Sequence, residues 1–157
     1  MTSPTGFAYT RDQFRQTVDD ALAAARRVGA SDAGAEVSEG VGLSVSARLG
    51  ELENVERNRD KSLGVTVYVG QRRGNASTSD FSRVAIEQTV QAAYDIARFT
   101  AEDPAAGLPD AADLASAAVA ARDLELLHPW AIDAEAAATL ALRCEAAAFA
   151  TDKRVTN

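Results

Sequence analysis

The spacing of apolar residues indicates a helix near the start of the chain. Between Arg11 and Val28 they recur every three or four residues, as on one face of a helix: Phe14, Val18, Ala21, Leu22, Ala25 and Val28. The preceding Thr10-Arg-Asp-Gln13 has the form of a capping box, in which both end side chains satisfy free amides at a helix start. Gly29 suits the left-handed conformation that often ends a helix. The pattern predicts a helix over residues 11–28.

Between residues 33 and 80 the period becomes two, which is typical of strands with one buried face. We expect the apolar members of this pattern to be buried against the helices, in particular Leu43, Val45, Val65 and Val67. Turns are expected near residues 40–42, 49–51, 59–61 and 70–73, where glycine or charged residues interrupt the pattern. Short connections of this kind join antiparallel neighbours. The segment is therefore predicted to form an antiparallel meander of about five strands.

Two more helices follow the predicted sheet. Ser82 is a suitable N-cap for a helix over residues 82–99, with an apolar stripe formed by Ile86, Val90, Ala93 and Ala97. Residues 100–132 contain prolines and many small residues and are expected to form a loop. Asp133 caps a predicted helix over residues 133–150, whose core positions would be Leu140, Cys144, Ala147 and Ala148.

These elements predict one α+β domain over residues 1–157. Its sheet would pack against the N-terminal and post-sheet helices, with the last helix as an addition. The tail Arg154–Asn157 is strand-like, and we expect it to enter the sheet of a following domain in a longer protein.

Composition and charge exclude several functional classes. The 157 residues include 16 Lys and Arg against 23 Asp and Glu, for a net charge of −7, which disfavours binding to nucleic acid or to anionic membranes. No stretch approaches the roughly 18 apolar residues that a membrane-spanning helix needs. The single cysteine excludes an internal disulfide and fits the cytoplasm.

The residues needed for hydrolytic chemistry are scarce. A catalytic zinc site takes several converging ligands, commonly histidines, and His128 is the only histidine. A nucleophilic Cys144 would have to recruit that same imidazole, and its helical spacing indicates a small buried core residue instead. We therefore expect no catalytic, metal-binding or cofactor-binding residues in this chain, which disfavours a free-standing hydrolase.

Several polar residues could bind a peptide or a partner protein. Arginines and an asparagine at neighbouring turns could hold a carboxylate or an acidic surface, and serines near a sheet edge could meet an incoming strand. The candidates are Arg57, Asn58, Arg59, Arg72, Arg73, Ser77 and Ser79. Ordinary solvated turns and a solvated sheet edge are the alternative interpretation of the same residues.

Segments along nearly the whole chain resemble one family when taken in order. They are Ser31–Val37, Gly42–Arg48, Gly50–Asp60, Leu63–Tyr68, Gly74–Asp80, Ala92–Pro104, Asp123–Pro129 and Asp152–Asn157. No single segment is specific, but their order and spacing resemble the N-terminal domain of the PmbA/TldE family of TldD/PmbA peptidases.

The resemblance implies a cytoplasmic, non-catalytic subunit that assembles with a TldD-type subunit. The pair would form a zinc metalloprotease acting on unstructured peptides, including modified peptide precursors and antitoxins. The family's zinc motif, His-Glu followed after three residues by His, belongs to the TldD-type subunit and does not occur here. The resemblance therefore implies that the zinc lies in the partner. An independent module that captures extended peptides by strand addition at its sheet edge is the alternative function.

Overall fold

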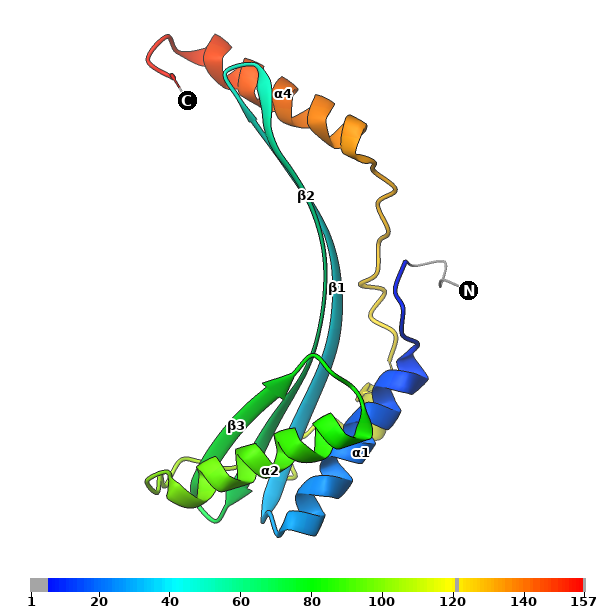
Figure 1. Ribbon diagram of the computed structural model, residues 1–157, viewed down its shortest axis with the longest axis vertical. Coiled ribbons are helices and arrows are strands. Elements are labelled where there is room, and N and C mark those ends of the chain that lie inside the picture. Colours follow the sequence, from blue (N-terminus) through cyan, green and yellow to red (C-terminus); the bar gives the residue numbers. More distant parts are fainter. Residues whose placement is uncertain (1–5, 121, 157) are drawn as a thin grey trace. The chain divides into compact units, whose positions relative to one another are not determined.

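The computed structural model describes residues 6–120 and 122–156 of an α+β chain (Figure 1). Its elements are α1 (Arg11–Val28), β1 (Asp32–Arg48), β2 (Glu51–Val69), β3 (Arg72–Thr78), α2 (Arg83–Phe99), α3 (Ala117–Ala120) and α4 (Ala134–Thr151). The strands form one sheet in the order β1-β2-β3.

The chain divides into two compact units. The first, here called the packed unit, is formed by the residues before Gly40 and by Asp60–Leu124. The second, the hairpin unit, is formed by Gly40–Arg59 and by the residues from Glu125 onwards. Strands β1 and β2 each contribute residues to both units.

The packed unit has a hydrophobic core between the sheet and two helices. Leu63, Val65 and Val67 alternate along β2 and are buried, as the period of two predicts. They meet small residues of α1 and larger ones of α2, and the rest of the buried cluster is Ala21, Ala24, Ala25, Ile86, Val90 and Ala93. The predicted stripe of α2 is thus confirmed in full, since Ala97 is buried as well.

Local capping groups set the ends of the helices at the predicted places. At the start of α1, the Gln13 amide donates to the Thr10 hydroxyl at 3.2 Å and the Thr10 amide donates to the Gln13 side chain at 2.8 Å. Gly29 ends this helix with φ of 91°. Ser82 and Asp133 accept from amides in the first turns of α2 and α4. The capping box and all three predicted N-caps are confirmed.

Strand β3 is covered closely by α2. It pairs antiparallel with β2, and Gly74 lies opposite Val67 in the register. A side-chain methyl at Gly74 would overlap the carbonyl oxygen of Ala93 and the amide of Ala97 on α2. Only glycine lets the helix backbone approach the strand this closely.

The hairpin unit contains the distal parts of β1 and β2, a two-residue turn and α4. Leu49 and Gly50 form the turn with φ of 54° and 82°, and positive φ at both positions is typical of a type I′ turn. The Leu49 and Gly50 amides donate to the Glu145 carboxylate of α4 at 2.6 and 2.8 Å. One side chain of α4 thereby satisfies both free amides at the tip of the hairpin.

The predicted number of strands was too high, although the fold class is confirmed. Residues 40–42 and 59–61 were expected to be turns but lie inside the long strands β1 and β2. In the hairpin unit, β1 and β2 form a two-stranded ribbon with much exposed surface. Glycine and charged residues are tolerated there, because neither face has to supply a full core. The described residues therefore form three strands where about five were expected.

Several residues expected in the core are not buried. Leu43 and Val45 are only half-buried, and Cys144 is exposed, as are Leu140, Ala147 and Ala148 of the predicted α4 stripe. Within the described part of α4, Ala138 alone is buried, because this alanine-rich helix has few large side chains to fill a core. Residues 154–156 of the tail form no strand, and Asn157 lies outside the described residues.

Candidate functional site

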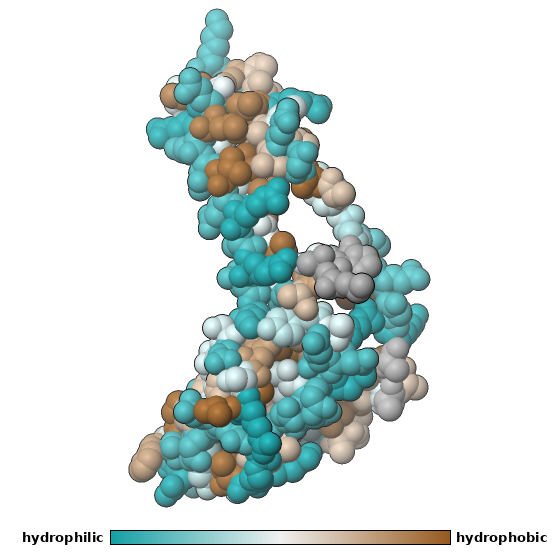
Figure 2. All heavy atoms as spheres, turned by 45° about the vertical axis from the view of Figure 1, so that its right-hand side comes forward, coloured by the Kyte–Doolittle hydropathy of each residue, from teal (hydrophilic) through white to brown (hydrophobic). Residues whose placement is uncertain are grey.

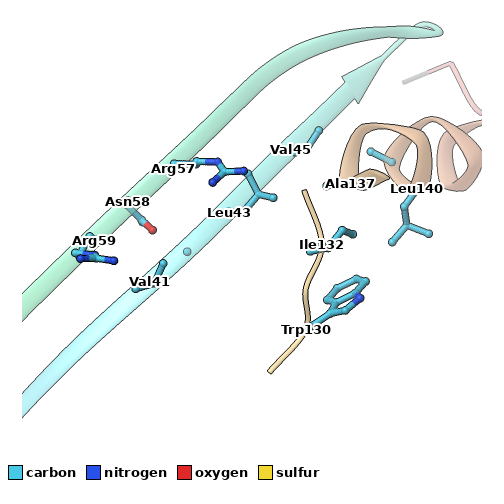
Figure 3. A pocket seen from close by; sticks show the side chains of 12 residues that line it. Val41, Leu43, Val45, Arg57, Asn58, Arg59, Trp130, Ile132, Ala137 and Leu140 are labelled. Carbon is cyan, nitrogen blue, oxygen red and sulfur yellow. The ribbon is translucent and has the colours of Figure 1, made fainter. Parts of the chain in front are cut away.

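A cavity of about 690 Å³ lies within the hairpin unit (Figure 3). Its lining comes from β1, from β2, from the segment before α4 and from the first turns of α4. The lining residues are Val41, Gly42, Leu43, Val45, Arg57, Asn58, Arg59, Trp130, Ile132, Ala137, Leu140 and Ala141. The volume is within the range of pockets that hold small ligands.

Strand β1 supplies an apolar side of the cavity. Val41, Leu43 and Val45 are spaced two residues apart, which places them on the same face of the strand. A side chain at Gly42 would overlap the amide of Asn58 on β2. The glycine thus leaves the space that the Asn58 side chain occupies.

The opposite side is formed by Trp130, Ile132 and the start of α4. The Ile132 amide donates to the Trp130 carbonyl at 2.9 Å, which closes a tight turn just before the helix. Asp133 then caps α4, and the two hydrogen bonds that the hairpin tip donates to Glu145 fix a later turn of the same helix. Trp130 is 73% exposed, so most of its ring remains available for contact.

The charge of the lining is positive. Among the described residues, Arg57 and Arg59 are its only charged members, and no aspartate or glutamate lines it. Within the described residues, the side chain of Arg57 makes neither an ion pair nor a hydrogen bond, whereas Arg59 has an interaction of its own. An arginine without an acidic partner attracts carboxylates, which it can bind through two parallel hydrogen bonds.

The two ends of the cavity differ in chemistry. Figure 3 shows Asn58 and Arg59 beside Val41, and Arg57 extending towards Leu43. Val45, Ala137 and Leu140 lie towards the other end, where the described lining carries no charge. The cavity can therefore hold a group that is apolar along its length and anionic at one end.

The predicted binding residues are divided between the two units. Arg57, Asn58 and Arg59 line this cavity from the middle of β2 rather than from a turn. The others belong to the packed unit: Arg72 pairs with Glu102 at 3.1 Å, and Arg73 is exposed on β3. The expectation that Arg57 and Arg59 lie at a turn was therefore wrong, whereas a role of any of these residues in binding stays a prediction.

The serines lie in the packed unit as well. Ser77 lines a separate depression of about 540 Å³ on the sheet, together with Gly34, Glu36, Gly64, Thr66 and Asn75 among others. Ser79 follows the end of β3 and is exposed. A role for either serine in binding stays a prediction.

Sequence reasoning missed the apolar wall of the cavity. Trp130 and Ile132 were placed in a loop without a function, although Trp130 is the only tryptophan of the sequence and lies three residues before the N-cap Asp133 of α4. A large exposed aromatic at such a fixed position is a signal for a contact surface. The place of this segment in the same cavity lining as β1 depends on long-range tertiary structure, which no local pattern encodes.

Metal-ligating residues form no cluster in the part of the chain that the structure describes. No group of three or more His, Cys, Asp or Glu side chains there could hold a metal ion. His128 and Cys144 are both exposed. Neither residue has the converging neighbours that a catalytic zinc requires.

Comparisons with known proteins identify the family. Residues 34–97 match the family model described as PmbA/TldA metallopeptidase domain 1. The chain is 49% identical to metalloprotease PmbA of Escherichia coli O157:H7 over 147 residues, which are 91% of this chain. The chain belongs to the PmbA/TldE family, whose first domain it carries. A PmbA homologue of Haemophilus influenzae is likewise 49% identical over 92% of the chain.

The PmbA relatives are much longer than this chain, which covers 32% and 31% of their lengths. Solved structures agree with the fold. TldE from Thermococcus kodakarensis matches 59% of this chain and 21% of its own with a TM-score of 0.54 and 13% identity. A proposed modulator of DNA gyrase from Bacteroides thetaiotaomicron matches 70% of this chain and 23% of its own, with a TM-score of 0.56 and 21% identity. No helix among the described residues is long and apolar enough to cross a membrane.

Proposed function

We propose that this chain is the N-terminal part of a non-catalytic, TldE-like subunit that assembles with a TldD-type zinc metalloprotease. The observation that carries the proposal is the 49% identity to metalloprotease PmbA over 91% of the chain. The complex would act in the cytoplasm on unstructured peptides, such as modified peptide precursors and antitoxins.

The inventory of side chains supports a role outside the chemical step. The chain has one histidine and one cysteine, and a catalytic zinc usually takes three protein ligands and one water. His128 and Cys144 are exposed, and no third candidate ligand joins them among the described residues. In this proposal the zinc and its ligands belong to the TldD-type subunit.

The hairpin unit supports a role in contacting the partner or the peptide. It contains the cavity with its unpaired Arg57 and a series of exposed apolar side chains, including Trp130 and Leu126. Figure 2 shows hydrophobic residues at the surface in separate patches among hydrophilic ones. Exposed aromatic and apolar residues next to an arginine are typical of binding surfaces.

Co-expression with a TldD-type subunit tests the proposal. We expect this chain to elute together with that subunit in size-exclusion chromatography. Zinc should be found only in samples that contain the TldD-type subunit, and an unfolded peptide should be cut only when that subunit is present. A purified sample of this chain should contain well under one zinc per molecule after dialysis.

A zinc site or peptide cleavage in this chain itself would be the opposite result. The non-catalytic role would be contradicted by two observations made together. One is stoichiometric zinc in this chain that is lost in His128→Ala, and the other is peptide cleavage by the chain alone. Replacement of the exposed Cys144 by Ser in parallel shows whether the thiol contributes a ligand.

A second candidate function is capture of extended peptides by strand addition. Strand β1 is an edge of the sheet, and the eight residues from Gly40 to Ala47 carry no charge. Charged residues are a common protection of exposed edges, and this edge lacks them. A strand-adding module would bind peptides without any TldD-type subunit, and the co-expression experiment separates the two functions.

A further inference from the structure

The cavity of the hairpin unit combines three features that point to one class of ligand. Apolar side chains line most of it, arginines lie towards one end, and no acidic residue of the described part of the chain belongs to its lining. A ligand that matches all three is apolar along its length and ends in a carboxylate. The carboxyl-terminal end of an apolar peptide has this chemistry.

Arg57 is the residue suited to bind the carboxylate. Its side chain makes no ion pair or hydrogen bond within the described residues and extends towards the cavity (Figure 3). A guanidinium can donate two parallel hydrogen bonds to one carboxylate, so it fixes orientation as well as charge. Asn58 offers an amide donor from the neighbouring position on β2.

The apolar body of such a peptide would meet both sides of the cavity. Leu43 and Val45 of β1 are half-buried, and Leu140 and Trp130 on the opposite side are 41% and 73% exposed. These side chains lose further contact with water when an apolar group enters. The volume of about 690 Å³ is enough for a few apolar residues.

We propose that this cavity binds the free carboxyl-terminal ends of extended apolar peptides, with Arg57 holding the terminal carboxylate. The inference deepens the proposed function and rests on its peptide-handling part. It gives this chain a preference for peptide ends, which include the new carboxyl termini that proteolysis creates.

Trp130 provides a direct reporter, because it is the only tryptophan and lines the cavity. The probe is the peptide acetyl-Gly-Ala-Leu-Val-Leu with a free carboxylate, titrated against the whole 157-residue chain while Trp130 fluorescence is recorded. Binding should shift the emission to shorter wavelength as the exposed ring becomes covered. The same peptide with a carboxyl-terminal amide should bind about tenfold more weakly or worse.

A matched pair of arginine variants locates the carboxylate. Arg57→Gln should weaken binding of the free acid about tenfold and remove its advantage over the amide. Arg48→Gln removes the same charge from the same hairpin but outside the cavity, and it should leave both affinities within about twofold. Both arginines are exposed, so neither substitution is expected to disturb folding.

Several specific outcomes of these titrations would overturn the inference. Equal binding of acid and amide, no response of Trp130 to either peptide, or loss of binding in Arg48→Gln alone would each do so. An amidated probe with an internal Glu that binds as tightly as the free acid would assign the cavity to internal acidic residues. A Trp130 shift that depends on protein concentration without peptide would assign it to a second copy of the chain.

Failure of this inference can be told apart from failure of the proposed function. The co-expression experiment measures assembly with a TldD-type subunit and does not depend on a carboxylate preference. Assembly without any Trp130 response would reject the peptide-end site alone, whereas a Trp130 response without assembly would reject the subunit role alone.

Discussion

The packed unit and the hairpin unit use the same strands for different purposes. Of the twelve buried apolar side chains in the described residues, eleven belong to the packed unit and only Ala138 belongs to the hairpin unit. Along β2 this contrast is direct, since Val65 is 2% exposed and Val55 is 46% exposed. One strand thus serves as a core element at one end and as a surface ribbon at the other.

The comparison indicates how the two units keep their structure. Burial of apolar side chains stabilises the packed unit, because the free energy gained follows the apolar area removed from water. The hairpin unit depends on a type I′ turn, a helix cap and the bonds from Leu49 and Gly50 to Glu145. Its larger apolar side chains are not buried in a core and remain available for binding.

The largest effect is expected from a charge placed in the core. Val65→Asp buries an unpaired carboxylate and should lower the free energy of unfolding by about 3 kcal/mol or more. Val55→Asp makes the same change on the exposed part of the same strand and should cost less than about 0.5 kcal/mol. Urea denaturation measures both. Equal losses would contradict the contrast between the two units.

The close contact of α2 with β3 gives the next effect. Gly74→Ala forces the helix backbone away from the strand and should cost about 2 kcal/mol of unfolding free energy, as overpacking usually does. Gly34→Ala on β1 is the control, because no atom of the described residues outside its chain neighbours lies within 4 Å of the added methyl. Thermal melting with unchanged stability for Gly74→Ala would show that the helix does not lie this close.

The hairpin tip should respond locally. Glu145→Gln weakens two charge-assisted hydrogen bonds, and amide exchange of Leu49 and Gly50 should become about tenfold faster. The amide of Val65 should not change, because the packed unit does not use these bonds. Glu135→Gln alters α4 without touching the turn and serves as the control. Acceleration in the packed unit would show that both units open together.

The smallest effect concerns pH. The Ser82 backbone amide, donating at 2.8 Å, holds the pKa of Asp80 below its ordinary value of 3.8, with further lowering by the Ser82 side chain and the charge of Lys61. A lowered folded-state pKa means that the stabilisation is present above pH 3.8 and is lost as the pH falls through the folded pKa.

Asp80→Asn should therefore lower the melting temperature slightly at pH 7, and the difference from the parent should shrink on acidification below pH 3.8. Asp19→Asn removes an equal charge from an exposed position of α1 and should show no such pH-dependent difference. A difference for Asp80→Asn that persists at low pH would show that the carboxylate is not the cause.

Local signals in the sequence were sufficient for the helices but not for the strands or the cavity. The boundaries of α1, α2 and α4 lie within one residue of prediction, because Thr10, Ser82 and Asp133 cap neighbouring amides. Glycines at 40 and 42 indicated a turn, yet an exposed ribbon accepts glycine in a strand. Whether such glycines form a turn or lie within a strand depends on how buried the segment is, and a local sequence pattern does not show this.

The candidate site was predictable only in part. Arg57, Asn58 and Arg59 were identified by their charge and polarity, whereas Trp130 and Ile132 were not. Their position in the cavity depends on α4 being tied to the hairpin tip, nearly a hundred residues away in sequence. Contacts of this kind arise from tertiary structure and leave no periodic trace in the chain.

Hydrogen exchange of this chain with and without a TldD-type subunit tests the central claim most directly. The claim is that the hairpin unit carries the binding surface while the packed unit only supports it. We predict that complex formation slows exchange in Gly40–Arg59 and in residues 125–156, and that exchange in Leu63–Val67 is unchanged. A complex that protects only the packed unit, or that protects neither unit, would contradict the claim.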